Sequence, residues 1–104
     1  AMRDLITVSE SRPNMFPILA YARKPESYAK YLPKKIDFIY QDVAQKDQVR
    51  ILEINSDRYQ ESGSRSMLAL KSQSIDASKN PKEVFNDASL ELEKNFEINQ
   101  SIKL

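Results

Sequence analysis

The residues able to do chemistry in this chain are carboxylates, lysines, tyrosines and serines, because it contains neither histidine nor cysteine. Without an imidazole it lacks the usual general base near neutral pH and the commonest ligand of transition metals. Without a thiol it has no disulfide, thiolate nucleophile or cysteine-type zinc site. These absences exclude most hydrolase and metalloenzyme designs, although Asp and Glu can still hold a hard cation.

Two carboxylates near the middle of the sequence lie in stretches that read as neighbouring strands. Asp37 lies in the first stretch, and the triplet Glu53-Ile54-Asn55 lies in the second. This arrangement resembles the core of the PD-(D/E)xK nucleases over about residues 26–72. The resemblance implies that Asp37 and Glu53 hold a divalent cation that activates water. Asn55 stands where that family has its lysine, and the interpretation we favour is that both carboxylates are ordinary polar positions on a half-exposed hairpin.

The densest feature of the sequence is a segment rich in tyrosine and basic residues, at positions 21–40. Tyrosine and arginine bury much area and still form hydrogen bonds, so this mixture is typical of protein interfaces. It could also stack on bases and follow phosphates, or simply pack the edge of the core with its lysines in solvent. We predict a partner-binding surface made of Tyr21, Arg23, Lys24, Tyr28, Lys30, Tyr31, Lys34 and Lys35.

Short elements are predicted in the N-terminal third. Leu5–Val8 is rich in β-branched residues and predicts a strand. A helix is then expected after Asn14, with Ile18, Leu19 and Ala22 on one face, and a second short helix from Pro25 to Pro33.

A central hairpin over about residues 36–55 is the main element that would position the two carboxylates. Ile36, Phe38 and Tyr40 alternate as in a strand, and Gln48–Asn55 would return antiparallel to it. The same residues also fit a single helix broken near Asp47. Residues 56–66 predict an exposed loop, and the segment 67–71 fits either a helix or a third strand.

A C-terminal helix over about residues 81–95 has the clearest start signal. Asn80, Pro81 and Glu83 suit the cap, the first turn and the capping box. Its buried stripe is expected to contain Val84, Phe85, Ala88 and Leu92. Beyond it, the even spacing of Phe96, Ile98, Ile102 and Leu104 predicts a terminal strand or arm.

The length of 104 residues fits one domain, 1–104, and 40% hydrophobic against 30% charged residues predicts a folded chain with a modest core. The fold class predicted is α+β, with a small antiparallel sheet packed against the C-terminal helix and short N-terminal helices. No stretch approaches 18 apolar residues and Arg3 and Asp4 follow Met2, so we expect a cytoplasmic protein that does not enter a membrane.

From these exclusions we predict a non-catalytic protein–protein interaction domain, of the accessory, inhibitor or immunity type. It would use no cofactor and no metal, and it would bind a protein partner or a second copy of itself. Nucleic acid is the weaker candidate, because a net charge of +1 is a small basic excess. The alternatives are a metal-dependent nuclease-like protein using Asp37 and Glu53, and a nucleic-acid-binding module using residues 21–40.

Overall fold

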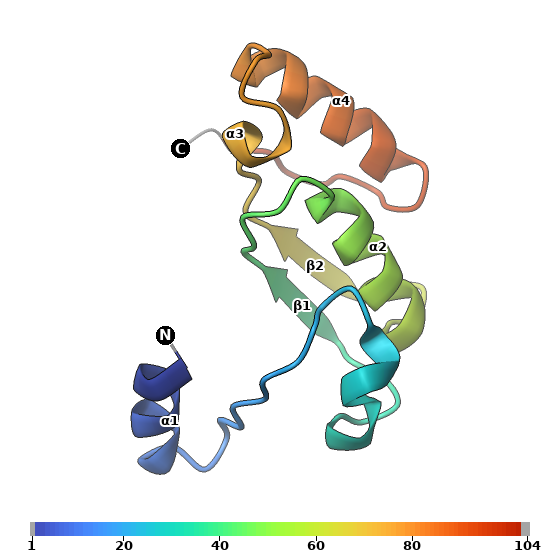
Figure 1. Cartoon of the computed structure of the whole chain (residues 1–104). Coiled ribbons are helices and arrows are strands. Elements are labelled where there is room, and N and C mark those ends of the chain that lie inside the picture. The colour runs from blue at the N-terminus through green and yellow to red at the C-terminus, as the bar shows by residue number, and fades with distance from the viewer. Residues whose placement is uncertain (1, 103–104) are drawn as a thin grey trace. The chain divides into compact units, whose positions relative to one another are not determined.

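A computed structural model describes residues 2–102, which contain five helices and one two-stranded parallel sheet (Figure 1). The chain divides by its internal packing into two compact units, Ala1–Pro33 and Lys34–Leu104. No helix in the described range is long and apolar enough to cross a membrane. The elements are α1 (Met2–Glu10), η1 (Pro25–Tyr31), β1 (Phe38–Gln41), α2 (Gln48–Tyr59), β2 (Arg65–Leu68), α3 (Ser72–Ile75) and α4 (Pro81–Glu93).

The first unit begins with helix α1, so the strand predicted over Leu5–Val8 is wrong. Hydroxyl groups support the helix by bonding back to its carbonyls: Thr7 Oγ1 donates to the Arg3 carbonyl at 3.0 Å, and Ser9 Oγ donates to the Ile6 carbonyl at 2.8 Å. Asp4 in the first turn also stabilises the helix, because its negative charge interacts favourably with the positive end of the helix dipole. These local interactions outweigh the β propensity of Leu5–Val8.

The helix predicted after Asn14 is also wrong, because residues 15–21 form a connection without regular structure. Proline explains the difference, since the residue before Pro17 is driven toward extended backbone and Pro17 has no N–H for a helix. The next predicted helix is present as η1, a 3₁₀ helix with Pro25 at its start. Leu32 is extended, as expected for the residue before Pro33.

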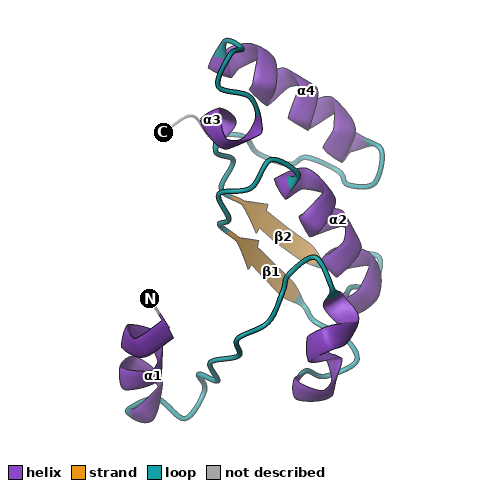
Figure 2. Cartoon of the chain, viewed as in Figure 1, coloured by secondary structure: helices purple, strands orange, loops and turns teal. Residues whose placement is uncertain are grey.

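The second unit contains the sheet, and here the predicted antiparallel hairpin at 36–55 is wrong. β1 lies within the first predicted strand, but it pairs in parallel with β2, from Phe38 opposite Arg65 to Gln41 opposite Leu68. Parallel strands need a crossover connection, and α2 supplies it (Figure 2). The chain therefore contains both helices and a sheet, as an α+β fold does, but the sheet is parallel and not antiparallel as predicted.

Residues 48–59 form a helix because their buried side chains follow helical spacing. Gln48, Leu52, Asn55 and Tyr59 recur every three or four residues and are all buried. The β-branched side chains of residues 48–55 favour a strand by propensity, which accounts for the wrong prediction. A hairpin would also have needed a tight turn at residues 44–47, which contain no glycine.

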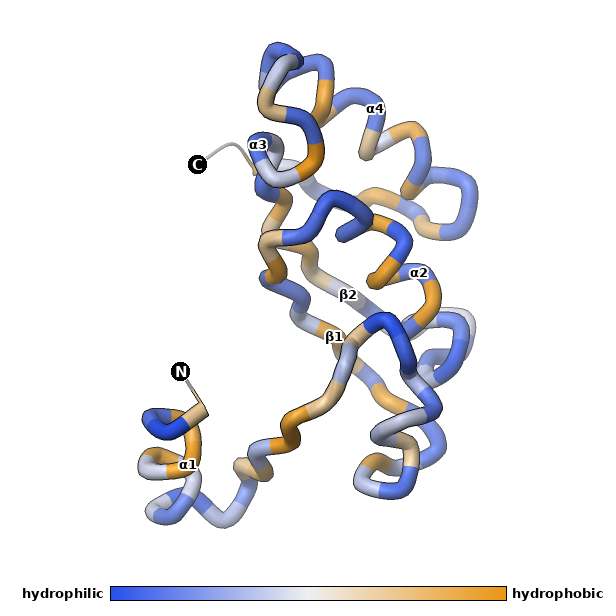
Figure 3. Tube along the Cα trace, in the orientation of Figure 1, coloured by the Kyte–Doolittle hydropathy of each residue, from blue (hydrophilic) through white to orange (hydrophobic). Residues whose placement is uncertain are grey.

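The core is built mainly by α2 against α4. Its apolar members are Val49, Ile51, Leu52 and Tyr59 from α2 and Val84 and Ala88 from α4. Figure 3 shows hydrophobic residues recurring along both helices between hydrophilic ones. The sheet is less covered: Phe38, Tyr40 and Met67 each expose more than half of their surface. Alternation along β1 then turns Ile39 and Gln41 to the other, more buried face.

Helix α4 confirms the clearest prediction from the sequence. The Asn80 side chain accepts a hydrogen bond from the Lys82 N–H at 2.9 Å, with Pro81 in the first turn. Val84 and Ala88 are buried as expected, whereas Phe85 is 39% exposed. The predicted terminal strand is wrong as far as the structure goes, because residues 96–102 have no regular structure, and Leu104 lies outside the described residues.

Candidate active site

The parallel pairing brings the carboxyl ends of β1 and β2 together, and a charged pair lies at this edge. Asp42 directly follows β1, and Lys71 comes three residues after β2. Lys71 Nζ lies 2.5 Å from Asp42 Oδ1, and both side chains are nearly half exposed. Ligands of open α/β sheets bind outside the carboxyl ends of the strands, so this ion pair marks the candidate active site.

The backbone beneath the pair is fixed by hydrogen bonds of β1. The Ala69 N–H donates to the Gln41 carbonyl at 3.0 Å, which extends the ladder one residue beyond β2. The buried Gln41 side chain donates from Nε2 to the Gln48 carbonyl at 2.6 Å. Strand β1 is thereby tied to the first residue of α2, close to where Asp42 emerges.

The amino ends of the strands carry a different group of charges. A hollow of about 470 Å³ lies there, lined by Asp37, Phe38 and the turn from Glu61 to Arg65. Lys35 Nζ pairs with Glu61 Oε1 at 3.7 Å, and both side chains are exposed. Gly63 in the turn has φ of +94°, a conformation that other residues rarely adopt.

The predicted metal pair is not formed, because Glu53 lies on helix α2 and not on a strand. Its Oε2 accepts from Asn95 Nδ2 at 3.0 Å, while Oε1 is buried without a hydrogen-bond partner. Burial raises the pKa of Glu53, and the nearby Glu91 raises it further, against the opposing effects of Arg50 and Asn95. Across residues 2–102 no group of three or more acidic side chains is placed to hold a metal ion.

The predicted partner-binding residues are distributed over both units, with Lys34 and Lys35 in the second and the other six in the first. Tyr21 and Tyr31 are exposed, and Lys30 Nζ lies 5.0 Å from the centre of the Tyr31 ring. The Tyr28 hydroxyl donates to the Ala22 carbonyl at 3.4 Å, so part of this side chain serves the local fold. Its role in partner binding stays a prediction.

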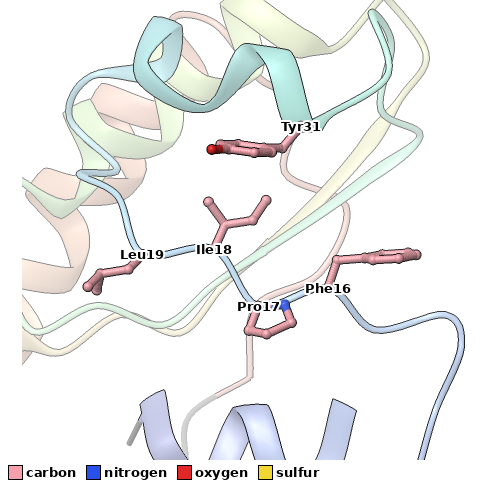
Figure 4. A pocket seen from close by; sticks show the side chains of 5 residues that line it. All are labelled: Phe16, Pro17, Ile18, Leu19 and Tyr31. Carbon is pink, nitrogen blue, oxygen red and sulfur yellow. The ribbon is translucent and has the colours of Figure 1, made fainter. Parts of the chain in front are cut away.

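Within the first unit, a hollow of about 410 Å³ is lined by residues 16–19 and Tyr31 (Figure 4). The Ile18 side chain points toward the Tyr31 ring, while Phe16 and Leu19 extend to either side. Phe16 is 79% and Leu19 86% exposed. The segment expected to bury one face of a helix therefore presents its apolar groups at the surface.

The pair Asp42 and Lys71 was not singled out from the sequence. The available signal was two short apolar runs, Phe38–Tyr40 and Met67–Leu70, with Asp42 two residues after the first and Lys71 directly after the second. That signal becomes informative only when the intervening segment is recognised as a helix, since a β–helix–β order places both strand ends at one edge.

Comparison with known proteins identifies the family. The profile of the family described as Fibrillarin matches residues 1–104, the whole chain. The chain belongs to the fibrillarin family. A Pyrococcus abyssi relative, a fibrillarin-like rRNA/tRNA 2′-O-methyltransferase, is 42% identical over 103 residues, and a relative of the same name from Methanopyrus kandleri is 43% identical over 104.

Solved fibrillarins have the same fold over the matched region. Methanococcus jannaschii fibrillarin, a pre-rRNA processing protein, superposes with a TM-score of 0.83 at 42% identity, over 89% of this chain and 40% of that one. A fibrillarin solved in complex with Nop5p gives a TM-score of 0.90 at 35% identity, over 94% and 46%. Aeropyrum pernix fibrillarin, solved with natively bound S-adenosyl-L-methionine, gives 0.72 at 40% identity, over 89% and 40%.

The fibrillarin match corrects the functional predictions. The relatives are named as methyltransferases, so a non-catalytic accessory or inhibitor domain is the wrong class, and so is a nuclease. Their names also include rRNA and tRNA, which speaks against the prediction that nucleic acid is the weaker candidate for a partner. The predicted protein partner agrees with the relative solved with Nop5p. The alignment covers 99% of this chain but only 45% of the Pyrococcus abyssi relative, so the chain spans less than half the length of that relative.

Proposed function

We propose that this fibrillarin-family chain forms part of an RNA 2′-O-methyltransferase and that Asp42 and Lys71 belong to its reacting site. The observation that carries the proposal is the ion pair at the carboxyl ends of two parallel strands, in a chain whose 42%-identical relatives are methyltransferases. Such an edge is where α/β sheets bind nucleotides and related ligands.

The absence of histidine and cysteine does not oppose this chemistry. A methyl donor brings its own leaving group, so the protein's task is to bind, orient and stabilise charge. When bound, S-adenosyl-L-methionine supplies a methyl group on a positively charged sulfur. The chain's residues at this edge fit a polar, charged ligand, because Asp42 and Lys71 are ionic and half exposed.

The two side chains would act on the ribose hydroxyl in different ways. The Asp42 carboxylate can accept a hydrogen bond and so orient the hydroxyl, and it can take up the proton that the hydroxyl gives up. The Lys71 ammonium can donate hydrogen bonds to the oxygen and stabilise the negative charge that develops as its proton leaves. Each would also hold the other in place, since their charged groups are in contact.

A chimeric enzyme tests the proposal directly. The part of the Pyrococcus abyssi methyltransferase that matches this chain is replaced by the chain itself, and transfer of tritiated methyl groups to RNA is measured. The unmodified relative serves as positive control. We expect the chimera to methylate RNA, and we expect Asp42→Asn and Lys71→Met to reduce the rate at least tenfold.

A matched substitution controls for loss of positive charge alone. Lys79→Met removes a half-exposed lysine of another ion pair, away from the strand ends and the predicted partner-binding residues, and should leave the rate within twofold. A folded chimera that methylates RNA equally well with and without Lys71→Met would contradict the assignment. A folded chimera with no methyl transfer at all would contradict the proposed function.

We also propose that the protein partner is a Nop5-type protein, as in the fibrillarin that matches 94% of this chain. The predicted Tyr/Lys/Arg segment is the surface to test, through its most exposed aromatic residues, Tyr21 and Tyr31. Capture by immobilised Nop5 should fall when both become alanine, while Leu90→Ala, an exposed apolar control in the second unit and outside residues 21–40, should have no effect. Equal capture of all three proteins would place the interface elsewhere.

A further inference from the structure

Gln48 is an unusual residue for the interior of so small a protein. Its exposed fraction is 0%, and it is the largest fully buried side chain among the described residues. A buried amide is costly unless all its polar atoms are hydrogen-bonded, and glutamine is mostly an exposed residue in folded proteins. Its contacts therefore indicate what it stabilises.

The Gln48 side chain holds the backbone of Lys71 at two points. Its Oε1 accepts from the Lys71 N–H at 2.9 Å, and its Nε2 donates to the Lys71 carbonyl at 3.2 Å. The same Nε2 donates its second hydrogen to the Gln45 carbonyl at 2.8 Å. The amide thus behaves toward Lys71 as a neighbouring strand would, although the two residues are 23 positions apart.

This contact compensates for the place of Lys71 in the fold. Lys71 lies beyond the last paired residue of β2, where the ladder no longer fixes the backbone. Its four-carbon side chain is nearly half exposed and can reach many positions. When the Lys71 backbone is fixed, its ammonium group is limited to positions near Asp42. Asp42 directly follows strand β1, which is tied to the first residue of α2.

We propose that Gln48 is a positioning residue, whose buried amide clamps the Lys71 backbone so that the ammonium group meets Asp42. The inference rests on the proposed function for its catalytic consequence, but the clamp is a property of this chain alone. Groups that act through others in this way often matter to activity as much as the groups that they orient.

A purely structural role is the competing explanation, and Asn55 offers a matched control. Asn55 is also a buried amide on α2, and its Nδ2 donates to the Ile51 carbonyl within the same helix at 2.9 Å. Replacing it by leucine should disturb the core of α2 without any direct effect on Lys71. Gln48→Met removes the whole clamp, and Gln48→Glu keeps an acceptor for the Lys71 N–H but loses the donor to the carbonyl.

Hydrogen exchange by NMR on the 104-residue chain measures the clamp without any ligand. In the unmodified chain the Lys71 amide should be protected to within about tenfold of the Ile51 amide, which lies inside α2. Gln48→Met should speed exchange at Lys71 at least tenfold relative to Ile51, Gln48→Glu should speed it less, and Asn55→Leu should leave the ratio unchanged. A Lys71 amide that exchanges freely in the unmodified chain overturns the proposal even if the variants do not fold.

Methyl transfer by the chimera then measures the consequence. Gln48→Met should lower kcat at least tenfold with KM for RNA changed by less than threefold, because binding is kept while the reacting group is misplaced. Asn55→Leu should leave kcat within threefold. If Lys71→Met abolishes transfer but Gln48→Met leaves kcat unchanged, Gln48 is not a positioning residue. If the chimera is inactive in every form, the proposed function fails, while the exchange ratio still decides whether the clamp exists.

Discussion

The two ends of the parallel sheet differ in how their charged groups are held. At the carboxyl ends, the buried Gln48 side chain binds the Lys71 backbone, and Asp42 directly follows Gln41, whose buried side chain donates to the Gln48 carbonyl. At the amino ends, Lys35 and Glu61 are exposed charges near a glycine turn. The same helix, α2, connects both ends, so the difference comes from local side chains and not from the fold.

The contrast teaches where to look for function in a small sheet. A surface ion pair in solvent contributes little to stability, and its geometry is loosely defined. An ion pair whose backbone is fixed by buried amides has a defined geometry at the cost of burying polar groups. Burying polar groups at this cost makes sense at a reacting site, where a defined geometry of the charged groups is needed, and has no such reason at an ordinary surface.

Removing the support that both ends share should have the largest effect. Leu52 is 3% exposed in the middle of α2, and Leu52→Ala would leave a cavity in the core beside this helix. We expect a loss of about 2–5 kcal/mol in the free energy of unfolding. Urea unfolding followed by circular dichroism measures it, and a loss below about 1 kcal/mol would show that α2 is not the common support.

Weakening only the carboxyl end comes next. Gln41→Met keeps the size of a buried side chain but removes its hydrogen bond to the Gln48 carbonyl, so we expect a loss of about 1–3 kcal/mol. Asp37→Asn, at the amino end, is the matched control and should change the free energy of unfolding by less than about 0.5 kcal/mol. Equal effects of the two substitutions would remove the distinction between the ends.

Beyond the two ends of the sheet, a pH titration tests the contact between α2 and α4. We expect a smaller effect on the free energy of unfolding there. Burial and Glu91 raise the pKa of Glu53 above its usual value of 4.5, so the folded chain binds this proton more tightly than the unfolded chain does. The stabilisation is complete below about pH 4.5 and is lost as the pH rises through the folded-state value. Glu53→Gln should therefore raise stability at pH 7 and flatten the decline above pH 4.5. An unchanged pH profile would contradict this account.

The smallest effect is expected at the amino end itself. Lys35→Met and Glu61→Gln each remove one partner of an exposed ion pair at 3.7 Å. Either change should alter the free energy of unfolding by less than about 0.5 kcal/mol, and the difference should shrink further in high salt. A loss above about 1 kcal/mol would show that this end is built as firmly as the other.

The parts of the fold that depend on local signals could be predicted from the sequence. Helix α4 was found through Asn80 and Pro81, and β1 through the alternation of Phe38 and Tyr40. The partner of β1 could not be found in this way, because parallel pairing joins strands that are separated by a helix and leaves no turn signal. Residues 48–55 were wrongly predicted as a strand for the same reason, because the strand that contains β1 was expected to pair with a segment close by in the sequence.

The site was missed for the same reason. Asp42 and Lys71 are 29 positions apart, and only the β–helix–β order brings them together. Gln48 gave no signal at all, since a glutamine at the start of a polar-looking segment predicts an exposed residue. The functional class was missed because the exclusions drawn from absent histidine and cysteine do not extend to reactions in which a bound donor carries the reactive group.

The order of β1, α2 and β2 also has a consequence for how the chain folds. The two strands can meet only after residues 42–64 have closed into a connection, so the sheet cannot start folding as a hairpin does. A compact α2 shortens that connection before the strands meet. Substitutions that weaken α2 should therefore slow refolding, whereas substitutions on the exposed face of the strands should mainly hasten unfolding.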